Sequence, residues 1–204
     1  MIHFAFAKAS DTTAEGYFIS KQGYWRTDHL PENFRISIRK IDVKELQAVS
    51  IGPGNKYFLR TNDKHHSHGI PAGTPLDSIR WCSFGPRNRI AIRKNNGAMY
   101  KQNDIISLRD KLDKLDDTSH ITHLCYGSGD SWIFCHKGIW HWYGIPERLA
   151  TKLKEAKSKQ TPVKNVVLSH FNHNLWFLEY ANGSSAYCLP ASWHHNVDFV
   201  RNHK

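Results

Sequence analysis

Apolar and polar residues alternate along the chain in short runs, and residues 121–149 show the arrangement most clearly. One alternating strand ends at Gly127, a polar turn of four residues follows, and a second strand begins at Trp132. Gly138 opens a third strand, and Pro146 starts a segment whose apolar residues lie four apart, as in an amphipathic helix. The pattern therefore predicts three short strands followed by a short helix.

The same order of strands and turns occurs five times along the chain. In four copies the strand-end residue lies five positions before the residue that opens the next strand, and these pairs are Gly52 and Tyr57, Gly85 and Ile90, Gly127 and Trp132, and Phe171 and Trp176. The first copy, from Tyr17 to Trp25, is less regular. Repeats of roughly 33 to 45 residues with three strands each are typical of radially arranged sheets. We therefore predict an all-β fold, a single five-bladed β-propeller, with blades at about residues 1–42, 43–77, 78–118, 119–162 and 163–204.

Two residue columns in the first strands favour a closed ring. The residues just before the turn are bulky, namely Phe6, Ile51, Phe84, Tyr126 and His170. The residues one position earlier are small, namely Ala5, Ser50, Ser83, Cys125 and Ser169. Successive strand residues face opposite ways. We expect the small column to crowd around a narrow axial channel and the bulky column to pack between neighbouring sheets.

The segments after the third strands predict short outer helices in several blades. Pro31, Pro146 and Pro190 each precede apolar residues at helical spacing, whereas residues 71–75 of the second copy carry too many helix breakers. The first copy has an inner strand of its own around His3, so closure of the ring requires no exchange of strands between the termini. Residues 196–200 are a candidate segment for docking on the first blade.

Charge and cysteine usage restrict the partners and the compartment. The chain has 28 Lys and Arg against 18 Asp and Glu, a net charge of +10, which favours anionic partners without specifying one. None of the four cysteines forms a CxxC pair, which suits a reducing compartment. The first eight residues lack a basic leader and no apolar run approaches ~20 residues. These features predict a cytoplasmic protein with no membrane partner.

Aromatic residues concentrate in the third strands and the loops after them. Trp25, Trp142, Tyr187 and Trp193 are candidate ligand-binding residues, because flat aromatic faces suit the C–H patches of sugar rings and also stack on bases. The alternative is that tryptophans at repeat positions, such as Trp25 and Trp140, are core residues between blades. The pattern leaves both interpretations open.

The segment from Ile121 to Trp142 resembles the lectin repeat of the tectonin and tachylectin type: strand, glycine, polar turn, strand with an aromatic start, glycine, aromatic-rich strand. The resemblance implies a β-propeller that binds glycans at equivalent sites between blades. The exposed residues differ from copy to copy, however, and equal sites require equal residues. This divergence moves weight from a multivalent lectin toward a protein with one site.

Two other classes of function remain open. Arg87, Arg89 and Arg93 lie at and after a turn in the third blade, where a basic rim could contact RNA, such as a tRNA, or another polyanion. An enzyme with a single active site on one face of the ring is the further alternative. Its candidate residues are His123, Cys125 and His141, which could transfer protons or attack a substrate.

No motif for a cofactor, a phosphate loop or a hydrolase nucleophile occurs in the sequence. His66 and His68 share one strand face, but no third metal ligand follows at a recognisable spacing. We therefore expect no cofactor and no metal site. The sequence favours a ligand-binding propeller that takes a glycan or a small molecule, with binding ranked above catalysis.

Overall fold

The computed structural model describes residues 2–8 and 14–203, and these residues form five antiparallel sheets of three strands each. Within each sheet the strands follow one another in chain order. The strands are β1 (Ile2–Lys8), β2 (Glu15–Lys21), β3 (Tyr24–Asp28), β4 (Ala48–Ile51), β5 (Tyr57–Arg60), β6 (His65–His68), β7 (Ile79–Phe84), β8 (Ile90–Lys94), β9 (Met99–Gln102), β10 (Ile121–Tyr126), β11 (Trp132–His136), β12 (Ile139–Tyr143), β13 (Val163–Leu168), β14 (Trp176–Tyr180) and β15 (Ser185–Cys188).

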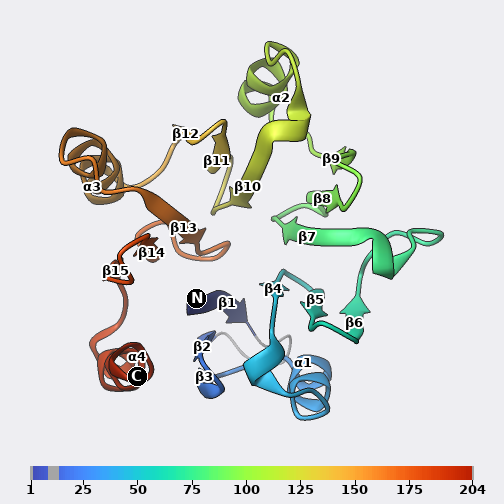
Figure 1. Ribbon diagram of the computed structural model, residues 1–204, viewed down its shortest axis with the longest axis vertical. Helices are drawn as coiled ribbons and strands as arrows, with labels where there is room; N and C mark the ends of the chain where they lie inside the picture. Colours follow the sequence, from blue (N-terminus) through green and yellow to red (C-terminus); the bar gives the residue numbers. More distant parts are fainter. Residues whose placement is uncertain (1, 9–13, 204) are drawn as a thin grey trace.

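The five sheets are blades around a common axis, seen end-on in Figure 1. The first strand of each blade is innermost, and β1, β4, β7, β10 and β13 each contact the next, with β13 contacting β1 in turn. This closed ring is a five-bladed β-propeller, as the repeats predict. The inner strands β7 and β10 point toward the axis, so that they converge at their C-terminal ends (Figure 1).

Two glycines at the strand ends allow neighbouring blades to pack closely. A Cβ atom on Gly52 would lie 2.2 Å from Cβ of Phe84 in the next blade, and one on Gly85 would lie 2.7 Å from Cγ of Tyr126. Phe84 and Tyr126 are fully buried. The bulky column therefore packs between sheets, as predicted, and it fills the space that a side chain at the glycine position would need.

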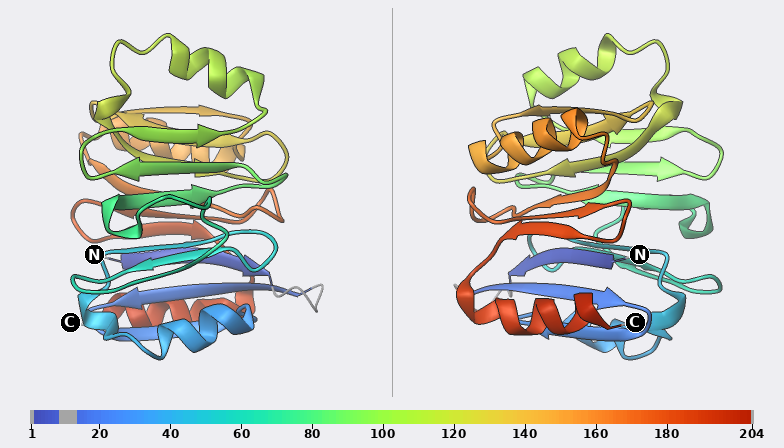
Figure 2. Two further views of the ribbon diagram at one scale, coloured as in Figure 1. Left: turned by 90° about the vertical axis from the view of Figure 1, so that its right-hand side faces the viewer. Right: turned by 60° about the vertical axis from the view of Figure 1, so that its left-hand side comes forward.

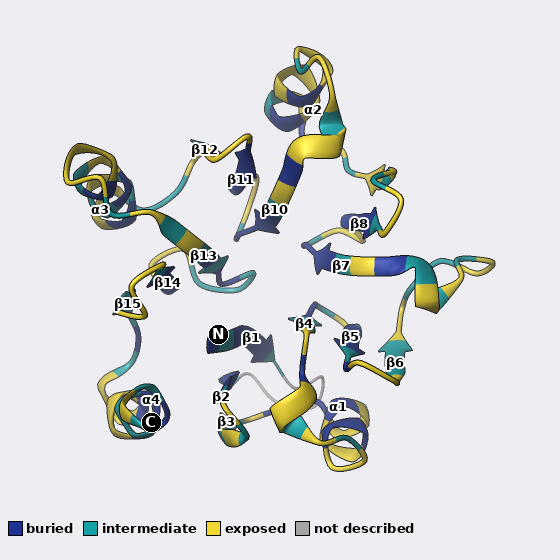
Figure 3. Ribbon diagram, in the orientation of Figure 1, coloured by how far each residue is buried: buried dark blue, intermediate teal, exposed yellow. Residues whose placement is uncertain are grey.

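Helices fill the wedges that open between radiating sheets, as Figure 3 shows by their buried inner and exposed outer faces. They are α1 (Glu32–Ile38), α2 (Ile106–Asp113), α3 (Glu147–Ser158) and α4 (Ala191–Asn202), with short 3-10 helices at Val43–Glu45, Leu76–Ser78 and Thr118–His120. In α3, Leu149 and Leu153 join a core cluster with Trp176 of the fifth blade. Only the 3-10 helix Leu76–Ser78 follows the described second blade, because residues 71–75 are rich in proline and glycine.

The first residue of a middle strand faces the helix that precedes its blade. The Tyr57 hydroxyl lies 2.8 Å from Oγ of Ser37 in α1, and Nε1 of Trp132 donates to Oγ of Ser107 in α2 at 3.0 Å. In each contact the polar group of a buried aromatic side chain, a hydroxyl or an indole N–H, forms a hydrogen bond with the neighbouring helix. Ile90, which takes this position in the blade without a preceding α-helix, is purely apolar.

The C-terminal helix fastens the last blade to the first. Trp193, Val197 and Val200 of α4 share a core cluster with residues of β1 and β2, and the Trp193 ring lies 4.6 Å from that of Tyr17. Figure 2 shows α4 alongside the strands of the first blade. The expected docking of residues 196–200 is confirmed. No helix within the described residues is long and apolar enough to cross a membrane.

The fifth copy corrects one detail of the predicted repeat. Leu168 pairs with Trp176, as Tyr126 pairs with Trp132, so β13 ends at Leu168, two residues earlier than the alignment of Phe171 with Gly127 implies. Leu168 and Val167 therefore stand in the bulky and small columns, and the assignment of His170 and Ser169 to those columns is wrong. The reason is a longer turn, in which the amide of Ser169 bonds the carbonyl of Leu175.

Candidate functional site

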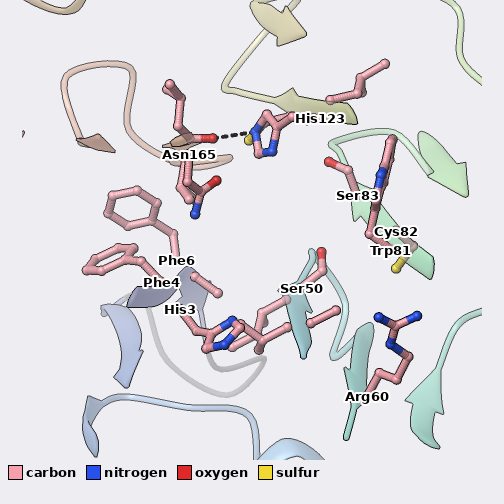
Figure 4. Close-up of a pocket in the computed structure, with 18 of the residues that line it drawn as sticks. His3, Phe4, Phe6, Ser50, Arg60, Trp81, Cys82, Ser83, His123 and Asn165 are labelled. Atoms are coloured by element: carbon pink, nitrogen blue, oxygen red, sulfur yellow. Dashed lines mark hydrogen bonds between the residues drawn. The ribbon is translucent and has the colours of Figure 1, made fainter. Parts of the chain in front are cut away.

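A cavity of about 360 Å³ lies on the axis of the ring and is lined by all five inner strands. We call it the axial cavity. The small column lines its inner part, as predicted for Ala5, Ser50, Ser83 and Cys125. The residues two positions earlier in each strand line the part above it, and they are His3, Ala48, Trp81, His123 and Asn165. Figure 4 labels His3, Trp81, His123 and Asn165 around the open space. The blades thus contribute equivalent positions but different residues, which builds one site rather than five.

β-Bulges direct three side chains to the entrance of the axial cavity. The pairing of β7, β10 and β13 with their middle strands is interrupted at Arg80, Thr122 and Lys164. A bulged residue is left unpaired, and the local kink re-aims its side chain. All three residues are exposed and line the cavity. The bulges lie at the N-terminal ends of the inner strands, where the ring is wider.

The entrance is strongly cationic. Arg60, at the end of β5, joins Arg80 and Lys164 there, and no Asp or Glu is among the described residues that line the cavity. We call these three residues the cationic mouth. Burial, and then the charge of Arg80, lower the pKa of the Arg60 guanidinium. Two guanidinium groups therefore repel each other at this entrance, and a bound anion would offset that repulsion.

The three side chains of the cationic mouth differ in how they are held. Arg60 donates to the carbonyl of Ile79 at 3.2 Å, which ties the second blade to the third. Nζ of Lys164 lies 3.3 Å from Oε1 of the buried Glu179, which also accepts from the amide of Ile2. Arg80 forms no hydrogen bond or ion pair with any described residue. Arg80 is therefore the side chain most available to a ligand.

Two histidines that line the axial cavity above the small column are held neutral. Burial lowers the pKa of His3 and of His123 to about 4. A ring nitrogen of His123 lies 2.7 Å from the carbonyl of Val166, and His3 bonds the backbone of Leu46. Each histidine therefore links its blade to the next and presents an uncharged ring to the cavity near neutral pH.

His170 lies across the opposite end of the axial cavity. It belongs to the long turn after β13, which reaches toward the centre of the ring in Figure 1. Its Nε2 lies 3.1 Å from the carbonyl of Ile51 in the second blade. Burial lowers the pKa of His170 to about 4. The two extra residues of this turn thus supply a side chain that obstructs the narrow end, and a ligand would enter through the cationic mouth.

The structure brings only two of the three candidate catalytic residues together. His123 and Cys125 share one face of β10, but His141 lies two strands away and packs on Phe134, with ring centroids 4.9 Å apart. Burial raises the pKa of the Cys125 thiol to about 12, and its sulfur accepts from the amide of Leu168. A thiol with such a pKa supplies almost no thiolate at neutral pH. This environment favours a packing role for Cys125.

The candidate glycan-binding aromatics do not form one surface. Trp193 is 4 % exposed and is part of the core beneath α4, while the Tyr187 hydroxyl donates to Asp198 at 2.9 Å. Trp25 and Trp142 pack at the edges of two different core clusters. The burial of Trp193 leaves its ring no exposed face for a ligand, which contradicts its prediction as a ligand-binding residue. Its apolar ring is instead needed to fasten the last blade to the first.

Two of the three candidate polyanion-binding arginines are buried. Arg89 is only 2 % exposed, and its guanidinium bonds Asp104, Asp130 and the carbonyl of Gly129, which joins the third blade to the fourth. Arg93 is 5 % exposed and donates to backbone carbonyls, among them that of Thr118. The prediction that Arg89 projects from the rim is therefore wrong.

Arg87 alone among these three is exposed. It lies within 4 Å of the same two carboxylates that hold Arg89, on the face of the ring opposite to the cationic mouth. The sequence reasoning missed Arg60, Arg80 and Lys164. The sequence does hold a signal for two of them. Arg80 and Lys164, like Thr122, are polar residues that interrupt an apolar inner strand, each three positions before the small-column residue of that strand.

Comparisons with known proteins add no argument about the fold or the function of this chain. No protein-family model matches the chain, and no curated protein matches it. Among solved structures, virginiamycin B lyase from Staphylococcus aureus aligns at a TM-score of 0.28 with 10% identity, over 91% of this chain and 69% of that one. A structure described as YCF48 bound to D1 peptide aligns at a TM-score of 0.29 with 11% identity, over 93% and 65%. Both are β-propeller-type structures, but similarity this low carries no argument about the fold, ligand or activity of this chain.

Proposed function

We propose that this chain is a non-catalytic binding protein that takes one phosphate-bearing ligand into the axial cavity through the cationic mouth. The observation that carries the proposal is the gathering of Arg60, Arg80 and Lys164 at the entrance of a cavity with no acidic lining residue among those described. Three cations from three blades suit a group with several anionic oxygens, and guanidinium groups bind phosphate in a two-pronged geometry.

The size and lining of the axial cavity favour a nucleotide or the terminal nucleotide of an RNA strand. A volume of about 360 Å³ lies at the lower end of small-molecule sites. Trp81 offers an aromatic face to a base, and Asn165 with the neutral His123 offers hydrogen-bonding groups. The phosphate would meet the cationic mouth while the base lies deeper. The proposed RNA-binding site is therefore the axial cavity and not the third-blade arginines that the sequence predicts.

Glycan binding, which the lectin-like repeat implies, stays a prediction. The chain carries half-buried aromatic rings at Trp25 and Trp142, but these stand on different blades and have different neighbours. Equal glycan sites between blades would need equal rings in equal surroundings. The divergent residues around the axis support a single site more strongly.

The experiment is a fluorescence-anisotropy titration of the whole chain with a labelled, 5′-phosphorylated tetranucleotide of single-stranded RNA. We expect saturable binding that weakens steeply as salt is raised, because binding releases counterions. Arg80→Ala should weaken binding at least about tenfold, the loss of roughly 1.4 kcal/mol that one charge-assisted contact supplies.

Arg87→Ala is the matched control, since it removes the same charge from the opposite face of the ring. We expect it to change the dissociation constant less than about twofold, because long-range effects of one exposed charge are screened. Equal losses in the two variants would show that binding depends on net charge rather than on the cationic mouth. Binding of neutral oligosaccharides with no binding of RNA would favour the lectin interpretation instead.

A further inference from the structure

A second cavity lies on the outside of the ring, between α3 and the last strand of the fifth blade. It has a volume of about 670 Å³. Its walls are the residues of α3 from Glu147 to Glu155 on one side and Ser185 to Tyr187 of β15 on the other, with Trp176 and Arg201 between them. We call it the α3 groove. It shares no lining residue with the axial cavity.

One buried donor in this groove has no acceptor. Trp176 is 3 % exposed, and its Nε1 has no hydrogen-bond partner among the described residues. The equivalent residue of the fourth blade, Trp132, donates its Nε1 proton to Ser107 in the first turn of α2. The equivalent of Ser107 in α3 is Arg148, since Leu149 and Leu108 are the matching buried positions. The fifth blade therefore has a donor where the fourth has a complete hydrogen bond.

Arg148 makes this difference informative. An arginine has five donors and no acceptor, so it cannot satisfy the indole N–H as Ser107 does. Arg148 is exposed and forms no ion pair with a described residue, so its long side chain can move aside to admit another group. A carboxylate placed there would accept from Trp176 and pair with Arg148 at the same time. The chemistry therefore calls for an anionic acceptor from outside the chain.

The shape of the groove favours an extended peptide over a compact ligand. The α3 wall from Glu147 to Glu155 rises about 12 Å, the length of roughly four residues in an extended strand. The opposite wall, β15, pairs only with β14 among the described strands, so its outer edge is open to a further strand. A peptide that adds to such an edge gains main-chain hydrogen bonds, and its alternate side chains face the two walls.

The charges around the groove indicate an acidic peptide. The lining residues Arg148, Lys152 and Arg201 outnumber the lining carboxylates Glu147 and Glu155 by one charge. Lys152 pairs with Glu155 at 3.0 Å and Arg201 with Asp198 at 2.8 Å, which leaves Arg148 as the lining cation without an ion pair among the described residues, and the whole chain carries an excess of ten positive charges. We propose that the α3 groove binds an extended acidic segment of a partner protein, with one carboxylate held between the indole N–H of Trp176 and Arg148.

The test follows the indole N–H signals of the whole chain by two-dimensional ¹H–¹⁵N NMR, with the Trp176 signal assigned from Trp176→Phe. The probe is a blocked octapeptide of alternating Glu and Val, and the control probe replaces each Glu by Lys. We expect the Glu peptide to move the Trp176 signal downfield in a saturable way. The Lys peptide should leave it in place.

Arg148→Ser is the decisive variant, because it copies Ser107. It should satisfy Trp176 internally, shift that indole signal without ligand, and weaken peptide binding at least tenfold while the melting temperature holds or rises. Lys154→Ser, on an exposed position of the same helix, is the matched control and should change binding less than twofold. If Arg148→Ser fails to fold, Arg148→Gln replaces it with the same expected loss of binding.

Three outcomes would overturn the proposal: no movement of the Trp176 signal with the Glu peptide, equal binding by the Lys peptide, or undiminished binding by the Arg148 variants. If glutarate binds as tightly as the peptide, the proposal of an extended peptide is overturned, and the groove is a site for a small carboxylate. Arg80→Ala should leave peptide binding intact, so a failure of the axial site and a failure of this site remain distinguishable.

Discussion

Acid should destabilise the fold through the neutral histidines on the axis, and His123 is the clearest case. Its pKa is lowered from 6.5 to about 4, first of all by burial, and the only opposing contribution is the hydrogen bond to the carbonyl of Val166. Above pH 6.5 both the folded and the unfolded chain hold this ring neutral. As the pH falls below 6.5 the unfolded chain takes up a proton that the folded chain refuses. Stability is therefore lost between about pH 6.5 and 4.

The size of the effect follows from the two pKa values. With 6.5 in the unfolded chain and about 4 in the folded one, His123 should cost the fold about 2 kcal/mol at pH 5 and almost nothing at pH 7.5. His123→Gln keeps a donor for the Val166 carbonyl and removes the titration. The stability difference between wild type and this variant should therefore shift by about 2 kcal/mol in favour of the variant on going from pH 7.5 to pH 5.

Urea unfolding at several pH values, followed by circular dichroism, measures this difference directly. Comparison with the variant cancels the contributions of all other titrating groups. His29→Gln, at a half-exposed position away from the axis, controls for the loss of any histidine. A difference between wild type and His123→Gln that stays constant from pH 7.5 to pH 5 would refute the burial of a neutral ring at this position.

Three further outcomes test the packing. Gly85→Ala should destabilise the chain by about 1–3 kcal/mol in urea unfolding, because its Cβ would meet the ring of Tyr126; an effect of under about 0.5 kcal/mol would contradict the contact. Arg89→Met should lower the free energy of unfolding more than Arg87→Met, because it removes a buried guanidinium that bonds Asp104 of the third blade and Asp130 and the Gly129 carbonyl of the fourth; equal losses would contradict this contact. Cys125 should resist iodoacetamide at pH 8 until the chain unfolds, and rapid alkylation in mass spectrometry would show that the thiol is accessible.

The sequence predicts the propeller because the same spacing constraint acts in each blade. Gly52 and Gly85 are required where the next blade approaches, and the alternating strands and Pro-led helices recur around them. The fifth blade departs from this rule because its turn is longer, and the apolar Phe171 imitates a strand end. Phe171 lies five positions before Trp176, as Gly127 does before Trp132, so the local pattern does not reveal that the turn of the fifth blade is longer.

The site is less predictable than the fold for a different reason. The axial cavity is built from four to six residues of each blade, most of them in one short stretch, and these five stretches are far apart in the sequence. The arginines of the third blade form a compact cluster in the sequence. Arg89 and Arg93, however, bond residues of other elements that only the fold brings near, so they are not available to a ligand. Arg80 and Lys164 reach the axis because bulges turn them there. The sequence shows a polar residue that interrupts each apolar strand, but it does not show that a bulge directs this residue toward the axis.

Isothermal titration calorimetry of the whole chain with the 5′-phosphorylated RNA tetranucleotide tests the single axial site most directly. We expect one ligand per chain, with binding lost in Arg80→Ala and retained in Arg87→Ala. A stoichiometry near five, or binding that survives Arg80→Ala unchanged, would contradict a site at the cationic mouth and would point to separate sites on the individual blades.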